Sequence, residues 1–243
     1  MQLSDDEIRR ILAQERRRIK KKKKKRRRIS FLIILFVILI TFIVVIIHRE
    51  DLGLSSSKAV IFIDPGHGGD DPGSFTHKRQ EKDDTLKLAL KIREYLEIQN
   101  YKVVLSRDDD SSVDRYKRGE MANKSGARIM LSLHRNKSPD SGNGIEIYTP
   151  SKNDNKSNVL ARKIMDNLVE VGFSERNIRA GTLTSSTDDY PENANLKMPS
   201  CLIEVGFISD AKDNKLFDDN LAKNAKAIAD AIDDSFIEFY ENK

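Results

Sequence analysis

Residues 58–73, KAVIFIDPGHGGDDPG, decide the fold of this chain. Residues 59–63 are five consecutive apolar residues with the length and β-branched content of a buried strand. The chain then turns through three glycines around His67, where the missing Cβ atoms let the backbone bend sharply and let a bulky group approach the imidazole. The pattern therefore predicts a histidine presented at the end of a strand.

A second histidine, His134, stands in the same kind of context. Residues 128–133, RIMLSL, form another short apolar run that ends at this histidine. If the two strands are neighbours in one open sheet, their ends lie side by side and the two imidazoles face each other. Paired imidazoles of this kind are a usual part of a metal site.

Helical and strand-like segments alternate through the rest of the chain. The predicted order is helix 81–100, strand 102–106, helix 113–124, strand 128–133, strand 144–148, a helix through 160–171, strand 198–205 and a helix through 221–239. Residues 174–198 have no clear period, although a strand is expected within 177–185. The alternation predicts an α/β domain with an open, mostly parallel (mixed) sheet that is covered by helices on both faces.

The net charge of +5 is unevenly distributed along the 243 residues. Residues 1–28 hold 14 Lys/Arg against 4 Asp/Glu, whereas residues 29–243 hold 29 against 34. The globular part is mildly acidic, so we expect no nucleic-acid partner. The segment DPGHGGDDPG matches neither GxGxxG nor a phosphate loop, which argues against nucleotide binding. The single cysteine, Cys201, excludes an internal disulfide, and we expect it to pack within its strand.

The N-terminal region predicts a membrane anchor. Residues 16–28 contain twelve basic residues in thirteen, and residues 29–47 that follow are apolar except for Ser30 and Thr41. Nineteen residues of helix match the hydrocarbon core of a bilayer, about 30 Å thick. The basic flank favours a cytoplasmic N-terminus and suits anionic lipid headgroups. A cleaved signal peptide is the alternative, but both its basic and its apolar regions would be too long.

This topology divides the chain into four parts. They are a basic cytoplasmic tail at 1–28, a single transmembrane helix at 29–47, a linker at 48–57 and an extracytoplasmic domain at 58–240. The protein is therefore expected in the cytoplasmic membrane as a single-pass protein, with its N-terminus inside and its larger domain outside.

Four residues are candidates for chemistry. Two imidazoles and a carboxylate are a familiar ligand set for catalytic zinc, and Glu81 at the mouth of helix 81–100 supplies the carboxylate beside His67 and His134. Glu204, at the end of an apolar strand, is the candidate general acid and base. Spacing alone leaves simpler interpretations open, such as His67 as a turn cap and Glu81 as a solvated acid at a helix start.

Four segments, in order, resemble the signature blocks of the zinc-dependent N-acetylmuramoyl-L-alanine amidases of the amidase-3 family: AVIFIDPGHGGDDPG, EKDDTLKLA, SLHRN and KMPSCLIEVGFISD. The resemblance covers residues 59–237. It implies an α/β fold with a mixed sheet and hydrolysis of the amide between the lactyl group of N-acetylmuramic acid and L-alanine of the peptidoglycan stem peptide. It also implies zinc ligands at His67, Glu81 and His134 and a catalytic glutamate at Glu204.

The chain departs from the family pattern in two places. Where the family often has a small residue followed by Asn-Ala, this chain has Arg135, Asn136 and Lys137. We expect Arg135 to place bulk and charge near the cleft and to affect substrate fit. Residues 75–80, FTHKRQ, lack the family's Asn-Gly-like turn, and His77 is interpreted as a loop histidine rather than a competing ligand.

The leading hypothesis is a membrane-tethered peptidoglycan amidase with zinc as its cofactor. A zinc exopeptidase on cell-wall peptides is an alternative from the same chemical class. A catalytically idle domain that binds peptidoglycan is a second alternative, disfavoured because the chain keeps all four candidate positions. Enzymes of this kind can need a protein activator that opens the cleft, and the sequence is silent on that partner.

Overall fold

The computed structural model describes residues 5–47, 57–76, 78–140, 142–152 and 154–242. The chain divides into two compact units, Met1–Ser56 and Ser57–Lys243. Residues 1–4 of the predicted tail, residues 48–56 of the predicted linker and His77 lie outside the described residues.

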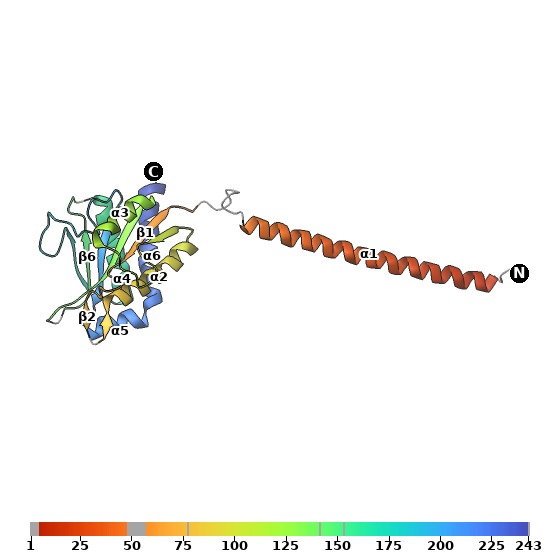
Figure 1. Ribbon diagram of the computed structural model, residues 1–243, viewed down its shortest axis with the longest axis horizontal. Helices are drawn as coiled ribbons and strands as arrows, with labels where there is room; N and C mark the ends of the chain where they lie inside the picture. Colours follow the sequence, from red (N-terminus) through yellow and green to blue (C-terminus); the bar gives the residue numbers. More distant parts are fainter. Residues whose placement is uncertain (1–4, 48–56, 77, 141, 153, 243) are drawn as a thin grey trace. The chain divides into compact units, whose positions relative to one another are not determined.

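In the first unit, the described residues form one helix, α1 (Asp5–Ile47), 43 residues long (Figure 1). The basic and apolar runs are therefore continuous, which agrees with the good helix propensity of Lys and Arg. Lys20–Val44 meets the length and hydropathy criterion for a membrane span, and its qualifying window has a mean hydropathy of 2.5. An anchor and a signal sequence both meet this criterion.

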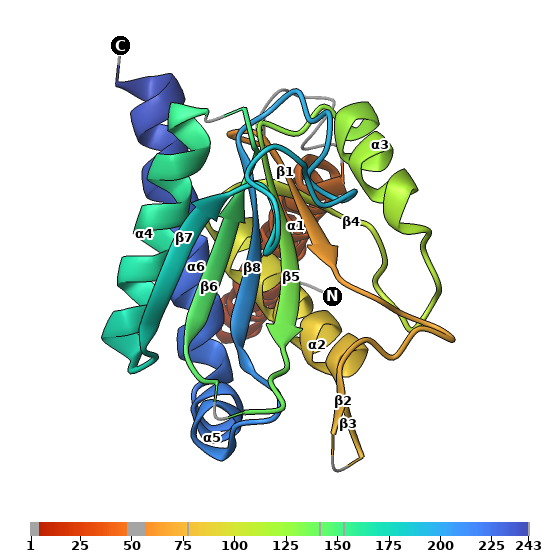
Figure 2. The same ribbon diagram turned by 90° about the vertical axis from the view of Figure 1, so that its left-hand side faces the viewer.

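The second unit is built on a six-stranded sheet (Figure 2). In spatial order its strands are β4 (Lys102–Leu105), β1 (Val60–Pro65), β5 (Ile129–Asn136), β8 (Ser200–Phe207), β6 (Ile145–Thr149) and β7 (Glu175–Ala180). The first four run parallel, β6 is antiparallel to β8, and β7 is parallel to β6. The predicted mixed, mostly parallel sheet is confirmed.

One face of the sheet carries the main hydrophobic core. It is covered by α2 (Glu81–Ile98), α4 (Asn155–Val171) and α6 (Leu221–Phe236), which lie on one side of the strands in Figure 2. Alternate residues of each strand point into this core, and Ile63, Leu133 and Ile203 are fully buried there. The amphipathic helices bury their apolar faces against these side chains.

The opposite face is covered more sparsely. The only helix that packs there among the described residues is α3 (Arg115–Ser125), over a small cluster of Phe62, Ala122, Ala127 and Met130. The irregular residues 182–199 complete the cover, and Asn193 Nδ2 donates to the Tyr148 carbonyl at 3.2 Å. Helices therefore lie on both faces, as predicted, but one face stays partly open.

Some elements differ from the prediction. The segment expected as a loop before Glu81 holds a small hairpin, β2 (Phe75–Thr76) and β3 (Arg79–Gln80). An additional helix, α5 (Ala211–Asp219), precedes α6. The Asp210 side chain stabilises its first turn by accepting a hydrogen bond from the Asp213 N–H. After α6 the chain closes with a π-helical turn, η1 (Ile237–Glu241).

Candidate metal centre

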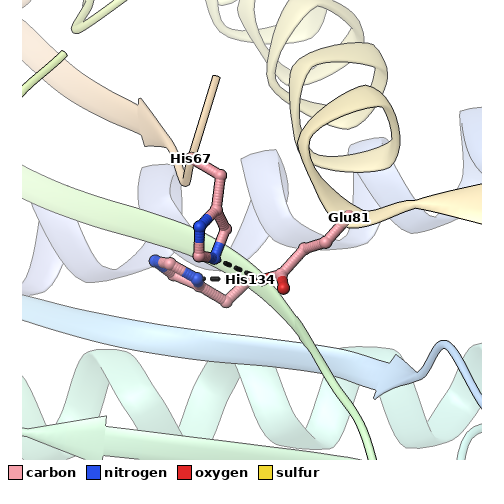
Figure 3. A group of neighbouring side chains, drawn as sticks. All are labelled: His67, Glu81 and His134. Carbon is pink, nitrogen blue, oxygen red and sulfur yellow. Dashed lines mark hydrogen bonds and ion pairs between the residues drawn. The ribbon is translucent and has the colours of Figure 1, made fainter. Parts of the chain in front are cut away.

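The two histidines meet where β1 and β5 run side by side. His67 follows β1, and His134 lies near the end of β5, which pairs with β1 in parallel. Their ring centroids are 4.9 Å apart, with the rings nearly perpendicular (Figure 3). The prediction that the two imidazoles face each other is therefore confirmed.

The Glu81 carboxylate, at the first residue of α2, joins the two imidazoles (Figure 3). Its Oε1 lies 3.2 Å from His67 Nε2 and 2.9 Å from His134 Nδ1. One ligand atom from each of the three residues lies within 4.8 Å of the other two. Backbone donors fix the carboxylate, because Arg135 N–H donates to Oε1 at 2.9 Å and Ser74 N–H donates to Oε2 at 2.7 Å.

Two glycines make room for this cluster. A Cβ on Gly66 would collide with the His134 ring. A Cβ on Gly73 would lie 2.6 Å from His67 Cδ2 and 2.7 Å from Glu81 Oε2, and its φ of +63° also disfavours side chains. The glycine-rich sequence thus forms a cradle in which three ligand-type side chains approach one another.

A neighbouring carboxylate orients His67. The Asp71 Oδ2 atom lies 2.8 Å from His67 Nδ1, four residues along the turn. This contact fixes the ring so that Nε2 points toward Glu81, in the way that carboxylates orient metal-ligating histidines. His67 itself has a φ of 62°, a strained value for a side chain that large, so the turn holds it against a local preference.

Buried polar contacts hold the turn between β1 and His67. Asp64 is fully buried and accepts from Arg118 Nη1 at 2.6 Å, Ser106 Oγ at 2.5 Å and Ser132 Oγ at 2.7 Å. Arg118 Nη2 also donates to the His67 carbonyl at 2.8 Å, and Arg107 Nη2 donates to the Gly66 carbonyl at 2.8 Å. These contacts fix the backbone of the turn that carries His67.

In this cluster, one carboxylate, Glu81, interacts with two imidazoles, His67 and His134. Burial lowers the pKa of His134, but the hydrogen bond and charge of Glu81 outweigh it and raise the pKa to about 9. The same balance of burial against Glu81 leaves the pKa of His67 above its ordinary value. Burial works to raise the pKa of Glu81, yet its hydrogen bonds with the two imidazoles leave that pKa well below its ordinary value.

Glu204 lies beside the cluster. It stands on β8 directly opposite His134 in the parallel pairing of β5 and β8. Its Oε2 is inaccessible to solvent and accepts no hydrogen bond from the described residues. Burial raises the pKa of Glu204 to about 8, although the positive charge of His134 opposes the shift. A carboxyl group in this state is suited to exchanging protons near neutral pH.

A pocket of about 420 Å³ opens onto these groups. Both histidines, Asp71 and Glu204 line it from the sheet side. The start of α3, Tyr190 and Glu192 line other parts of it. All four candidate residues therefore converge at one place, with Glu81 behind the imidazoles, although their roles stay predictions.

The cluster fits a zinc ion. Two imidazole nitrogens and one carboxylate oxygen are the donor set of catalytic zinc sites that keep a fourth position for water. His134 Nδ1 faces Glu81, whereas its other ring nitrogen, Nε2, is, like Glu204 Oε2, a buried atom without a hydrogen-bond partner among the described residues. Unpaired polar atoms of this kind are uncommon in folded proteins and indicate a place where a ligand or ion completes the bonding.

Arg135 does not take the place expected for it. Its side chain is only 1% exposed, and Nη1 pairs with Asp84 at 2.7 Å while Nε donates to the Val205 carbonyl at 3.1 Å. The guanidinium also lies 4.5 Å from the centre of the Phe217 ring. Because neighbouring residues of a strand point to opposite faces, Arg135 points away from the pocket that His134 lines. The expected position of the Arg135 side chain near the cleft is therefore wrong.

Cys201 behaves as predicted. It is fully buried in the main core, and burial raises the pKa of its thiol. Its side chain packs as an apolar residue and is no nucleophile.

Comparison with known proteins agrees with the resemblance. The profile of the N-acetylmuramoyl-L-alanine amidase family matches residues 61–234. A sporulation-specific N-acetylmuramoyl-L-alanine amidase of Bacillus subtilis is 34% identical over 181 residues, which cover 72% of this chain and 68% of the relative. This chain therefore belongs to the N-acetylmuramoyl-L-alanine amidase family, enzymes that hydrolyse an amide bond of peptidoglycan.

Solved structures share the fold. An N-acetylmuramoyl-L-alanine amidase from Clostridium difficile 630 superposes with a TM-score of 0.68 and 30% identity, covering 76% of this chain and 100% of that protein. The CwlD amidase of Clostridioides difficile, solved in complex with the GerS lipoprotein, has a TM-score of 0.65 and 30% identity over 74% of this chain and 98% of that one.

Several residues that shape the site were not identified from the sequence. Asp64 and Asp71 lie within the first quoted segment but were given no role, although an acid four residues after a histidine is a usable signal. Arg118 lies on a helix and Glu192 lies in an irregular segment. Neither belongs to a motif with a recognisable spacing, so no local sequence pattern indicates a role for them.

Proposed function

We propose that this chain is a membrane-anchored zinc amidase that cleaves the bond between N-acetylmuramic acid and L-alanine of the stem peptide. The convergence of two imidazoles and two carboxylates at one pocket carries the proposal. Family membership supports the bond that is cut. His67, Glu81 and His134 are proposed to hold the zinc ion, and Asp71 to orient the first of them.

When bound, zinc would lower the pKa of its water to about 7 and polarise a carbonyl beside it. The protein's part is proton transfer. The Glu204 carboxylate, which lines the pocket, accepts a proton from the water that attacks the lactyl carbonyl carbon, and it gives that proton to the leaving nitrogen of L-alanine as the C–N bond breaks. In the metal-free protein, burial raises the pKa of Glu204, which suits a group that both accepts and donates a proton.

The arrangement of the pocket favours these roles, metal binding by the three ligand residues and proton transfer by Glu204. Asp64 and Arg118 hold the turn that presents His67, so the imidazole needs no rearrangement when substrate arrives. The open face of the sheet leaves space for the substrate, whereas the other face is sealed by helices. A glycan strand with its peptide is long, and a pocket open to the surface accommodates such a chain.

The N-terminal helix is proposed to anchor the enzyme. We propose that residues 1–28 remain in the cytoplasm, 29–47 span the membrane, 48–57 act as a short tether and 58–240 work outside. The long apolar part of α1 supports a span, and the adjacent basic residues support this orientation through attraction to anionic lipids. Peptidoglycan outside the membrane would then lie within reach of the domain.

A protein activator is also proposed. The related CwlD amidase was solved in complex with the GerS lipoprotein, so at least one relative assembles with a partner. A partner outside the membrane is compatible with the proposed position of the domain.

The test uses full-length protein in detergent micelles with purified peptidoglycan and zinc. We expect mass spectrometry to detect stem peptides that begin with a free L-alanine amino group, together with glycan strands that have lost their peptides. We also expect one zinc ion per chain by elemental analysis, with the metal lost in His134→Ala. Release of single amino acids would indicate an exopeptidase, and binding without release would indicate an idle domain.

A further inference from the structure

Two arginines line the pocket, and they differ in what they contact. Arg118 is buried and donates to Asp64 and to three backbone carbonyls. Arg115 has a side chain that is 54% exposed, and its single ion pair among the described residues places Nε 3.5 Å from Glu192 Oε1. Of these two arginines, Arg115 is therefore the one whose guanidinium donors are available to a ligand.

Glu192 lines the same pocket and lies on the irregular segment 182–199. The residue is only 5% exposed, and its Oε2 is inaccessible to solvent and accepts no hydrogen bond from the described residues. A buried carboxylate oxygen that lacks a donor costs free energy. Because Oε2 is shielded in this arrangement, a turn of the Glu192 side chain into the pocket that it lines is what brings this oxygen to a bound donor.

Both side chains stand on fixed backbone. Arg115 is the first residue of α3, which Asp114 caps by accepting from two backbone N–H groups. Beside Glu192, the buried Asn193 donates to the Tyr148 carbonyl at 3.2 Å and accepts from Ser200 Oγ at 2.6 Å. The backbone of both residues is thus fixed before a ligand binds, so only their side chains need to adjust.

The substrate class can be inferred from this pair. A guanidinium group presents several N–H donors in a planar fork, so Arg115 can keep its contact with Glu192 and still bind a second carboxylate. A buried acceptor such as Glu192 Oε2 matches a peptide N–H. A peptide that carries an acidic group close to an amide N–H satisfies both residues at once.

We propose that Arg115 and Glu192 form a specificity subsite for the stem peptide, an inference that rests on the proposed amidase function. Arg115 binds a free carboxylate on the residue after L-alanine, and Glu192 Oε2 accepts a hydrogen bond from a peptide N–H of the same stem. The enzyme therefore prefers stem peptides in which that carboxylate is free over those in which it is amidated.

The experiment compares two muramoyl tetrapeptides that are identical except that the carboxylate after L-alanine is free in one and amidated in the other. We expect the full-length enzyme to cleave the free acid with a kcat/KM roughly 10- to 100-fold higher, the value of one charge-assisted contact. Arg115→Ala should abolish the preference by losing activity only on the free acid. Lys117→Ala, an exposed change on the same helix, should keep the preference.

Glu192→Ala separates the second contact from the first. We expect KM to rise about tenfold on both substrates while kcat changes little, because both substrates retain the peptide N–H. Glu192→Gln, which keeps an acceptor, should recover part of the loss. The unfolding temperature of each variant, measured by circular dichroism, separates lost binding from lost folding.

The outcomes distinguish two failures. Wild-type protein that cleaves neither tetrapeptide overturns the proposed function and this inference with it. Wild-type protein that cleaves both at equal rates, or an Arg115→Ala variant that loses activity equally on both, overturns the subsite while leaving the amidase function in place.

Discussion

The two faces of the central sheet are made by neighbouring residues of the same strands. On β1, β5 and β8, the residues Ile63, Leu133 and Ile203 point into the helix-covered core, where each is fully buried. The very next residues, Asp64, His134 and Glu204, point to the open face, where they form or support the pocket. Because successive side chains of a strand point to opposite faces, each of these three adjacent strands supplies one residue to the core and the next residue to the open face.

The open face itself contains two kinds of carboxylate. Glu146 on β6 is buried and accepts from four side chains. Its donors are Asn136 and Tyr148 on Oε2 and Arg176 and Asn177 on Oε1. Glu204 lies directly opposite it in the antiparallel pairing, yet Glu204 Oε2 has no donor among the described residues. The four hydrogen bonds of Glu146 suit a structural role, whereas the unpaired oxygen of Glu204 suits a group that exchanges protons.

The largest expected effect is a loss of turnover from a substitution on the open face that leaves stability intact. Glu204→Gln should lower kcat by about 10² to 10⁴ because the proton carrier is lost. Zinc content should stay at one ion per chain, and the unfolding temperature should stay equal or rise, because a carboxyl group that lacks a donor is replaced by an amide. Turnover measured on muropeptides, with elemental analysis on the same sample, checks both parts. A variant that cleaves normally would remove Glu204 from the mechanism.

A substitution of Ile203, the residue before Glu204, should have the opposite result: it should lower stability and leave turnover nearly unchanged. Ile203→Ala should cost about 2 to 5 kcal/mol of unfolding free energy, because it removes a fully buried side chain from the core and leaves a cavity. Below its melting temperature the variant should keep most of its kcat per folded molecule. Denaturant unfolding with activity at low temperature tests this. Equal losses of kcat in Ile203→Ala and Glu204→Gln would contradict the separation of the two faces.

A smaller effect concerns the pH dependence of the metal-free protein. The pKa of His134 is raised from 6.5 to about 9, chiefly through Glu81 acting against burial, so its contribution to stability is present below pH 6.5 and lost as pH rises through 9. Burial raises the pKa of Glu204 from 4.5 to about 8, which has the same sign and ends in the same range. The unfolding temperature after chelation should therefore fall between pH 6.5 and pH 9.

Zinc should reverse that trend. Imidazoles bind metal only when deprotonated, so zinc affinity and the stabilisation it brings should grow over the same pH interval. Thermal unfolding of chelated and zinc-loaded samples at several pH values measures the difference. A metal-free unfolding temperature that rises toward pH 9, or a zinc effect that shrinks, would contradict the charge balance among His67, Glu81 and His134.

Much of the covered face could be predicted from the sequence. Short apolar runs and amphipathic helices follow simple periods, and these gave the α/β class, the order of most elements and the meeting of His67 with His134. His67, His134 and Glu204 line one pocket, and Glu81 contacts both imidazoles, while the roles expected from the family motifs stay predictions.

The remainder depended on contacts between distant segments. The reversed direction of β6, and the sparse cover of one face, depend on how long connections pass over the sheet, which no local period encodes. Glu192 is brought to the pocket by an irregular segment for the same reason. Arg135 is different, because alternation along β5 already required it to point away from His134, so its burial was predictable and was missed.

The position of β8 has a consequence for biosynthesis. This strand lies between β5 and β6, although both precede it in the chain. A nascent polypeptide that ends before residue 200 carries both imidazoles but cannot join the two halves of the sheet, and it lacks the proton carrier altogether. If Glu204 carries the proton as proposed, hydrolytic competence arises last, when the final strand enters the middle of the sheet.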